Sequence, residues 1–121
     1  MPACRKGSAV EKNIQFEIVY TESAILDIEE KADYISGQLR EPSTAEKWYL
    51  RLRRIIQEEL STLPLKFPLY DRTPWNQRGI RLMAARNDVV LYSVDERSHT
   101  VYIRAVCTKG RDLSAHLGGQ E

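Results

Sequence analysis

Arginine side chains dominate the chemistry that the second half of this sequence could perform. Residues 72–111 carry eight basic and three acidic side chains, a net charge of +5, and all but one of the eight basic residues are arginine. Residues 11–63 carry eleven acidic and seven basic side chains, a net charge of −4. Guanidinium groups bind phosphates and carboxylates through paired hydrogen bonds. The second half is therefore expected to bind a polyanion or an acidic partner, unless its arginines are scattered over a solvated strand face.

Two kinds of chemistry are open to these basic residues. Metal-free RNA cleavage needs a base for the 2′-hydroxyl, an acid for the leaving oxygen and cations on the scissile phosphate. Arginine, lysine and tyrosine side chains on an exposed sheet face could supply them, and His116 is a further candidate acid or base near the C-terminus. The same surface could instead dock an acidic peptide, and the residue types alone do not separate the two.

The sequence contains no motif for other common kinds of catalysis or cofactor binding. The sequence has no phosphate-binding glycine loop, no HExxH, no CxxC and no serine flanked by elbow glycines. Its two cysteines, Cys4 and Cys107, are far apart, so no disulfide framework, no metal site and no cofactor is expected. Trp48 falls in an apolar helical stripe and is predicted to be a core residue. Trp75 stands in a long loop, where it could pack against the domain or contact a partner.

The length of 121 residues predicts a single domain. Residues 1–12 are polar and without periodicity, so they are interpreted as a flexible tail, followed by a domain over 13–117 and a second tail over 118–121. No apolar run is long enough to span a membrane, and no apolar stretch follows the basic N-terminal residues as in a signal peptide. We therefore expect a cytoplasmic protein that does not bind membranes.

The elements that must position these side chains follow from periodicity. Residues 14–20 alternate apolar and polar, as in a strand with one buried face. Two stripes at helical spacing follow, one from Ile25 to Leu39 and ended by Gly37 and the segment to Pro42, the other from Ala45 to Leu63. A proline-rich loop of about 15 residues then leads to three strand patterns, over 80–85, 89–94 and 101–106, the first two joined by a tight turn at Asn87-Asp88.

This β-α-α-β-β-β order predicts an α+β fold, a helical hairpin packed on a twisted antiparallel sheet of about four strands. The hairpin must cover one face of the sheet, because neither element can bury its apolar side alone. The other face, toward which Arg81, Arg104 and Tyr92 are expected to point, is left to solvent or to a partner.

The sequence resembles the RelE/ParE superfamily, the toxins of type II toxin–antitoxin modules, over roughly residues 14–113. The resemblance rests on ESAILDIEEKADYI after the first strand, on EPSTAEKWYLRLRRIIQEELSTLP, and on GIRLMAARNDVVLYSVDERSHTVYIRAVCTKGRDL. The last stretch looks like the strand pair of the family, with a basic residue and Asn at Arg86-Asn87, an apolar run that ends in Tyr92, a turn entry at Val94-Asp95, and a terminal Arg111-Asp112.

The resemblance implies a bacterial, growth-inhibiting protein of the kind that includes plasmid-stabilisation toxins, held inactive in a complex with a cognate antitoxin. RelE-like members cut mRNA in the ribosome with basic residues and a C-terminal tyrosine or histidine, whereas ParE-like members are thought to poison DNA gyrase. If this chain is a metal-free nuclease, the resemblance assigns catalysis to Arg81, Arg111 and His116. No tyrosine follows Lys109-Gly-Arg111, and Asp88 stands where many relatives carry an aromatic residue, so the ParE-like branch is favoured.

The resulting hypothesis is a toxin that acts on DNA gyrase and has no catalysis of its own. The alternatives are a RelE-like, ribosome-dependent mRNA endoribonuclease and a non-toxic protein that keeps the fold for antitoxin binding or autoregulation. The residues expected to contact the target are Arg81, Arg86, Arg104, Lys109, Arg111 and Tyr92.

Overall fold

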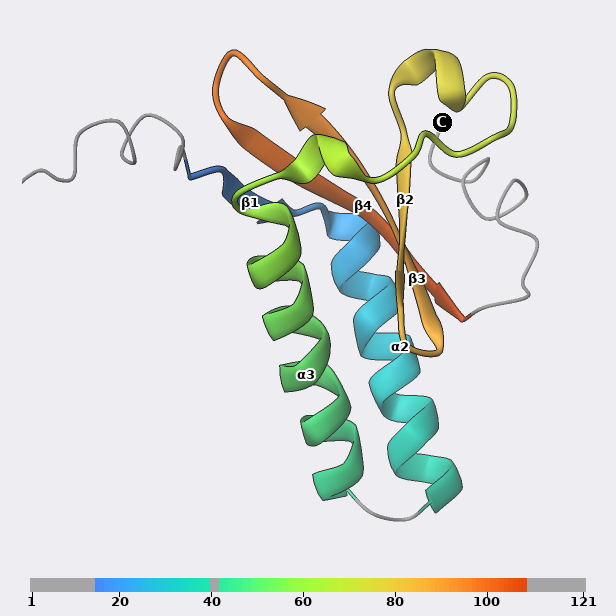
Figure 1. Cartoon of the computed structure of the whole chain (residues 1–121). Helices are drawn as coiled ribbons and strands as arrows, with labels where there is room; N and C mark the ends of the chain where they lie inside the picture. The colour runs from blue at the N-terminus through green and yellow to red at the C-terminus, as the bar shows by residue number, and fades with distance from the viewer. Residues whose placement is uncertain (1–14, 40–41, 109–121) are drawn as a thin grey trace, which may run out of the picture.

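The computed structural model describes residues 15–39 and 42–108, which form a four-stranded sheet with two long helices against it (Figure 1). The predicted α+β class and the β-α-α-β-β-β order are confirmed. In chain order the elements are β1 (Glu17–Tyr20), α2 (Glu22–Leu39), α3 (Pro42–Leu60), the short 3-10 helices η1 (Pro64–Lys66) and η2 (Asn76–Arg78), β2 (Arg81–Ala85), β3 (Asp88–Asp95) and β4 (Thr100–Thr108). The predicted tails, 1–12 and 118–121, lie outside the described residues.

The strands lie in the order β1-β4-β3-β2, and the sheet is mixed rather than antiparallel throughout. β2, β3 and β4 form the predicted antiparallel meander, but β1 pairs with β4 in parallel, with Glu17 opposite Thr100. The helical hairpin explains the direction. It carries the chain along one face of the sheet and back, so β1 and β2 enter the sheet in the same direction, and β4 shares that direction because β3 reverses between them.

Helix α2 begins three residues before the predicted stripe and ends with it at Leu39. The Thr21 hydroxyl accepts a hydrogen bond from the Ala24 N–H at 3.3 Å and donates one to the Ile103 carbonyl at 2.8 Å, so this cap also ties the helix to β4. Gly37 lies inside the helix and does not end it. Further along α2, the Asp27 carboxylate accepts a hydrogen bond from the Val106 N–H, close to the β-bulge between β3 and β4.

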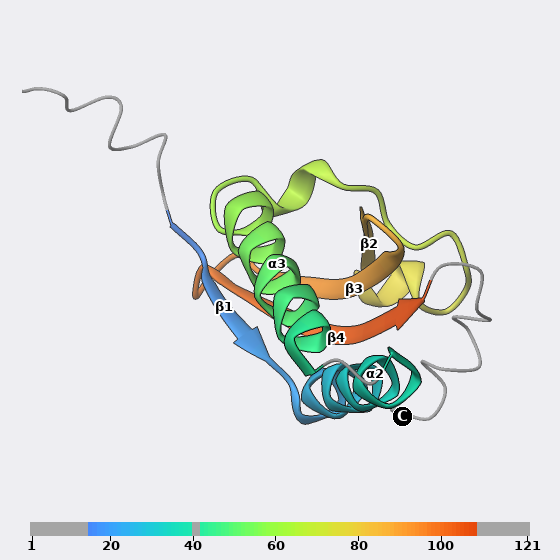
Figure 2. The same ribbon diagram turned by 90° about the horizontal axis from the view of Figure 1, so that it is seen from below.

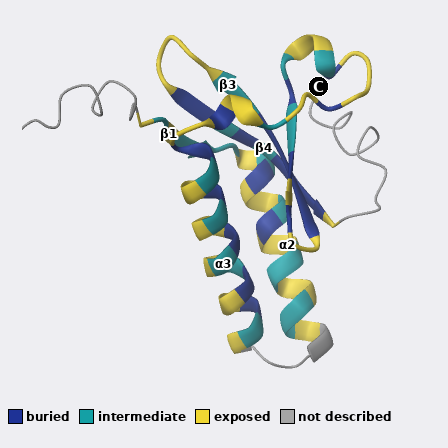
Figure 3. Ribbon diagram, viewed as in Figure 1, coloured by how far each residue is buried: buried dark blue, intermediate teal, exposed yellow. Residues whose placement is uncertain are grey.

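The main core lies between the helical hairpin and the sheet, where Ile28, Leu52 and Ile56 pack against Val90 and Ile103 (Figure 3). Sequence periodicity predicted most of both helical faces correctly, but Ile25 is 43% exposed, and Leu63, which lies beyond the end of α3 at Leu60, is 60% exposed. It did not predict a second apolar cluster on the opposite sheet face. The segment between α3 and β2 passes around the β2 edge (Figure 2), and the side chains of this second cluster are Tyr70, Trp75, Ile80, Val89, Leu91, Ala105 and Cys107.

That face is therefore largely covered by the protein's own loop and is not left open. Tyr70 and Trp75 are each 9% exposed. Of the two roles considered for Trp75, the structure shows packing against the domain. Burial of two aromatic rings on the sheet explains why a proline-rich segment of this length keeps a defined path.

The turn between β2 and β3 is Arg86-Asn87, one residue earlier than predicted, because Ala85 pairs with Asp88. Arg86 has φ 61°, in the left-handed region that favours glycine and asparagine. Among the described residues, no helix is long and apolar enough to cross a membrane.

Candidate functional site

Two of the predicted target-binding residues face the helical hairpin. Arg81 lies directly opposite Tyr92, and opposed residues of an antiparallel pair point to the same face. That face is the one on which Met83 and Ala85 join the main core. The expectation that Arg81 and Tyr92 point to the open sheet face is therefore wrong. The β3 segment is apolar on both sides, so its sequence could not show which side its tyrosine takes.

Arg81 is engaged by the loop that follows α3. Its Nη1 donates to the Phe67 carbonyl at 2.5 Å and to the Leu65 carbonyl at 3.3 Å. The backbone on either side reinforces this contact, since the Leu82 N–H donates to the Pro68 carbonyl at 3.0 Å. Arg81 therefore holds the start of this loop against β2, whatever else it does.

Tyr92 has no exposed surface, and its hydroxyl donates to the Pro64 carbonyl at 2.6 Å. Burial raises the pKa of this phenol far above its ordinary value of 10.0, and the nearby Arg81 guanidinium offsets only part of that rise. A phenol in this position neither reaches a target nor exchanges a proton with a substrate at neutral pH.

Arg104 is on the opposite sheet face, as predicted. Its guanidinium carbon lies 5.6 Å from the centre of the Tyr102 ring, and its Nε donates to the Ser93 hydroxyl at 3.1 Å. This half-buried arginine–tyrosine pair stands beside the area that Tyr70 and Trp75 cover, and it presents a cation and an aromatic ring on the outer face.

The three predicted basic residues that lie within the described ranges, Arg81, Arg86 and Arg104, do not gather on one surface. Arg81 and Arg104 face opposite sides of the sheet. Arg86 follows the other end of β2, five residues after Arg81. At a rise of about 3.3 Å per residue, the two arginines are roughly 16 Å apart along the strand. The remaining candidates, Lys109, Arg111 and His116, lie outside the described residues, so their roles stay predictions.

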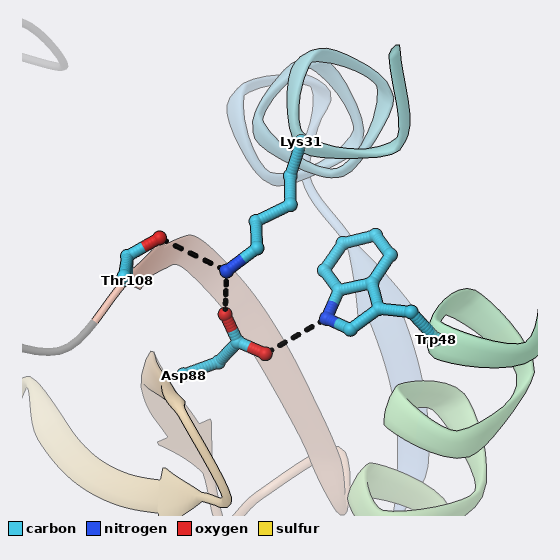
Figure 4. Close-up of polar contacts among 4 residues, drawn as sticks. All are labelled: Lys31, Trp48, Asp88 and Thr108. Atoms are coloured by element: carbon cyan, nitrogen blue, oxygen red, sulfur yellow. Dashed lines mark hydrogen bonds and ion pairs between the residues drawn. The ribbon is translucent and has the colours of Figure 1, made fainter. Parts of the chain in front are cut away.

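Asp88, which stands where many members of the resembled family carry an aromatic residue, points toward the two helices (Figure 4). It is 3% exposed. Its Oδ1 accepts from Lys31 Nζ at 2.6 Å and its Oδ2 from the Trp48 indole N–H at 2.8 Å. Lys31 Nζ also reaches the Thr108 hydroxyl at 2.9 Å. The carboxylate thus joins both helices to β3 and β4, and its charge is balanced by a lysine.

A groove on the outside of the helical hairpin was not predicted. It has a volume of about 440 Å³ and is lined mainly by apolar side chains between the end of β1 and the two helices. Arg53 lies between two of its tyrosines, 4.8 Å from the Tyr20 ring centre and 5.7 Å from that of Tyr49, and donates to the Tyr49 hydroxyl at 2.8 Å. That hydrogen bond raises the pKa of Arg53, and partial burial raises the pKa of Tyr20. Ile25, 43% exposed, lines the same groove.

Known structures resemble this architecture, although no family model and no curated protein matches the sequence itself. A RelBE toxin–antitoxin complex from Mycobacterium tuberculosis contains a chain that aligns with a TM-score of 0.58 and 17% identity, over 81% of this chain and 95% of that one. A chromosomal ParDE toxin–antitoxin system from P. aeruginosa aligns with a TM-score of 0.63 and 14% identity, over 78% and 96% of the two chains.

The chain has the fold of the RelE/ParE toxins. At these identities the likeness establishes the fold alone, and the two structures match too similarly to place the chain in either branch. The RelE/ParE fold that the sequence motifs indicated is therefore confirmed. The function of this RelE/ParE-like chain has to be inferred from the residues on its own surface.

Within this RelE/ParE-like fold, sequence reasoning missed Lys31, Trp48 and Arg53 as residues with specific polar contacts. Each lies on a helix whose apolar stripe was recognised. Lys31 and Trp48 pair with residues of distant strands, and Arg53 contacts the Tyr20 ring of β1 as well as Tyr49 of its own helix. The contacts with the strands have no local sequence pattern. Over residues 15–39 and 42–108, no three histidine, cysteine or acidic side chains come together as a metal site would require.

Proposed function

We propose that this RelE/ParE-like chain is the toxin of a type II toxin–antitoxin system, and that it arrests growth by acting on DNA gyrase when its antitoxin is absent. The supporting observation is the match to chains of two toxin–antitoxin systems over 95% and 96% of their lengths. The likeness covers nearly the whole of each of those chains, so little of either chain lies outside the fold that it shares with this one.

The groove on the helical hairpin supports an antitoxin partner. It offers apolar surface from Ile25, Ile28 and Ala32, with Glu29 and Arg53 at its rim. An amphipathic helix binds such a surface by laying its apolar side into the groove and its charged side along the rim. We propose that a helix of the antitoxin occupies this groove.

The gyrase target is favoured over mRNA cleavage because Arg81, one of the three candidate catalytic residues, and Tyr92, a candidate for target contact, are both held by contacts within the fold. Arg81 binds loop carbonyls, and the Tyr92 hydroxyl is buried against Pro64. Metal-free cleavage needs cations and a proton-transfer group around one phosphate. Neither side chain is placed to supply them.

One observation keeps a RelE-like nuclease as the second candidate. Asp88, one of the residues that favoured the ParE-like branch in the sequence, is paired with Lys31 and turned toward the helices. It would not repel RNA on the outer face. In this alternative Arg104 would bind phosphate, and Lys109, Arg111 and His116 would supply the chemistry.

The test is pulse labelling of DNA and protein synthesis after tightly controlled induction of the chain alone. If DNA synthesis stops first, with chromosome breaks, the gyrase proposal stands. If protein synthesis stops first and translated mRNA is cut without a need for metal, the nuclease replaces it. Normal growth would contradict both and leave a non-toxic, antitoxin-binding or autoregulatory protein.

A pair of matched variants connects that experiment to the surface. Arg104→Ala removes the half-buried guanidinium of the outer face and is expected to relieve growth arrest with little change in stability. Arg97→Ala removes an exposed arginine from the β3–β4 turn and should remain toxic. Equal toxicity of the two variants would remove Arg104 from the target-binding surface.

A further inference from the structure

A second pocket lies on the hairpin side of the sheet, at the end where β2 turns into β3. It has a volume of about 190 Å³. Its walls come from α2, α3 and the β2–β3 turn, and its lining includes Lys31, Trp48, Arg51, Leu52, Arg86 and Asp88. Of its lining residues, only Arg86 was predicted to contact the target, and the pocket shares no lining residue with the groove between Tyr20 and Arg53.

The charges of this pocket are unbalanced. Three cationic side chains line it, against the single carboxylate of Asp88. Lys31 already neutralises that carboxylate at 2.6 Å. Arg51 and Arg86 make no hydrogen bond, ion pair or ring contact with any other residue in the described ranges. Two guanidinium groups at the mouth of one pocket therefore have their hydrogen-bonding capacity unused by the described fold.

The backbone at Arg86 supplies an independent observation. At φ 61° a side chain with a Cβ atom is disfavoured, and a two-residue hairpin turn ordinarily places glycine or asparagine there. A long cationic residue in that position is a local cost to the fold that no described contact of Arg86 offsets. Strain of this kind is a reason to look for a function of the side chain.

We propose that this pocket binds a peptide segment in which a carboxylate side chain lies next to an apolar one. Arg51 and Arg86 would hold the carboxylate between their guanidinium groups, and the apolar side chain would pack against Trp48 and Leu52. Guanidinium groups bind carboxylates through two parallel hydrogen bonds, which a single small pocket can accommodate. The proposal concerns this site alone and does not require that the chain be a toxin.

A nucleic acid fits the same charges less well. Nucleic-acid affinity comes from several phosphates neutralised along a basic track. The helices beside this pocket belong to the half of the chain with a net charge of −4 over residues 11–63, and Glu29, Glu30 and Asp33 of α2 are all acidic. The pocket itself offers three cationic side chains rather than a longer basic track, whereas a peptide need present only one carboxylate.

The two tryptophans of the sequence make the site directly observable. The Trp48 indole lines the pocket and donates to Asp88, while Trp75 packs on the opposite sheet face. In the purified full-length protein, the two indole N–H signals in an NMR spectrum can be assigned with Trp75→Phe. A peptide of repeating Glu and Leu residues should shift the Trp48 signal and leave that of Trp75 unchanged.

The affinity of the same Glu–Leu peptide can be measured by fluorescence anisotropy when the peptide carries a fluorescent label. This affinity should depend on Arg51 and Arg86. Arg51→Ala and Arg86→Gly are each expected to weaken binding about tenfold, roughly the loss of one charge-assisted contact. Arg51→Lys should bind with intermediate affinity, because it keeps the charge but loses the fork. The same peptide with Gln in place of Glu should not bind.

Matched controls separate binding from folding. Arg54→Ala, on the same helix but outside the pocket, and Arg97→Gly, in the other hairpin turn, should bind the peptide as the wild type does. Because glycine is favoured at positive φ, Arg86→Gly should melt at the same temperature as the wild type or higher while binding less. Lower stability together with weaker binding would assign Arg86 a structural role and overturn this part of the proposal.

Two other results would overturn the proposal. If the Glu–Leu peptide leaves the Trp48 signal unchanged at millimolar concentration, the pocket is not a carboxylate site. If a twelve-nucleotide single-stranded RNA shifts Trp48 and the peptide does not, the arginines bind phosphate. Both results are independent of whether expression of the chain stops growth, so the failure of this site and the failure of the toxin proposal are distinguishable.

Discussion

Arg81 and Arg86 stand at the two ends of the same short strand, and their surroundings are opposite. Arg81 begins β2 in relaxed backbone and donates to two carbonyl groups of the preceding loop. Arg86 follows the strand at φ 61° with no partner among the described residues. Arg81 and Arg86 contribute equally to the net charge of the sequence. The structure shows that one arginine holds a loop in place, while the other is free to bind something else.

The same contrast extends to their neighbours. At the Arg81 end, the buried Tyr92 hydroxyl reaches loop backbone. At the Arg86 end, the buried Asp88 is held by Lys31 and Trp48 from the two helices. The first end is stabilised by loop carbonyls and the second by a charged pair. The predictions below test the two ends of the strand in turn.

The largest effect is expected at Asp88. Asp88→Ala leaves Lys31 and the Trp48 indole without their acceptor in a site that is almost closed to water, so the free energy of unfolding should fall by about 3 kcal/mol. Denaturant unfolding measures this change. Glu59→Ala is the control, because the Lys66–Glu59 pair has the same 2.6 Å separation but is exposed, and its loss should cost about 0.5 kcal/mol or less. Equal losses would contradict the importance assigned to burial.

Tyr92→Phe tests the opposite end of the strand. It removes only the hydroxyl, leaving the Pro64 carbonyl without its donor, and should lower the free energy of unfolding by about 1–2 kcal/mol. Tyr102→Phe, on the partly exposed outer face, is the matched control and should change stability by a few tenths of a kcal/mol. A neutral Tyr92→Phe would show that the buried hydroxyl is not a stabilising contact.

The same tyrosine gives a dependence on alkaline pH. Burial raises the pKa of Tyr92, and of Tyr20 to a smaller degree, above the value of 10.0 that each has when unfolded. The folded state therefore keeps protons that the unfolded state releases, and stability is complete below pH 10 and declines as the pH rises above it. Urea midpoints between pH 9 and 11 should fall in the wild type and fall less in Tyr92→Phe. Parallel slopes for the two proteins would contradict the assignment.

Arg81→Ala should cost about 1 kcal/mol, because the Leu65 and Phe67 carbonyls lose a charged donor but can still reach water. Limited proteolysis is the sharper measurement. Cleavage within residues 62–80 should become faster in Arg81→Ala, while Arg104→Ala should be cut at the wild-type rate. If the loop is equally resistant in both variants, its position does not depend on Arg81.

The smallest change in stability, and one of opposite sign, is expected at Arg86. Arg86→Gly relieves the positive φ and should stabilise the fold by about 0.5 kcal/mol, after allowance for the greater freedom of glycine in the unfolded chain. Thermal unfolding of Arg86→Gly beside Arg81→Ala should therefore move the two melting temperatures in opposite directions. Destabilisation in both would remove the contrast between the two ends of β2.

The sequence was sufficient for the fold because its strongest signals are local. The apolar stripes of α2 and α3, the proline-rich loop and the apolar runs of β3 and β4 each have a period or composition that specifies an element. The parallel pairing of β1 with β4 has no such signal. It follows from the path of the helical hairpin and involves residues at opposite ends of the chain.

The candidate site was predicted less well, and the turn at Arg86 shows why. Moving a hairpin turn by one residue exchanges the two faces of a strand. Because β3 is buried on both sides, its sequence does not indicate which face Tyr92 takes. Arg104 was placed correctly, since Tyr102 and Ser93 beside it are more polar than the residues facing the helices. The sequence also gave no sign that Tyr70 and Trp75 would cover the second face.

The position of β4 has a consequence for how the protein is made. It is the last described strand in the sequence, yet it lies between β1 and β3, with Glu17 opposite Thr100 and Asp88 opposite Thr108. A nascent chain that has not reached Thr100 holds both helices and the β2–β3 hairpin, but nothing links β1 to them through the sheet. Pairings of such sequence separation form late and slowly. The described sheet is therefore completed only after synthesis has passed β4, and any activity that depends on this sheet is withheld until then.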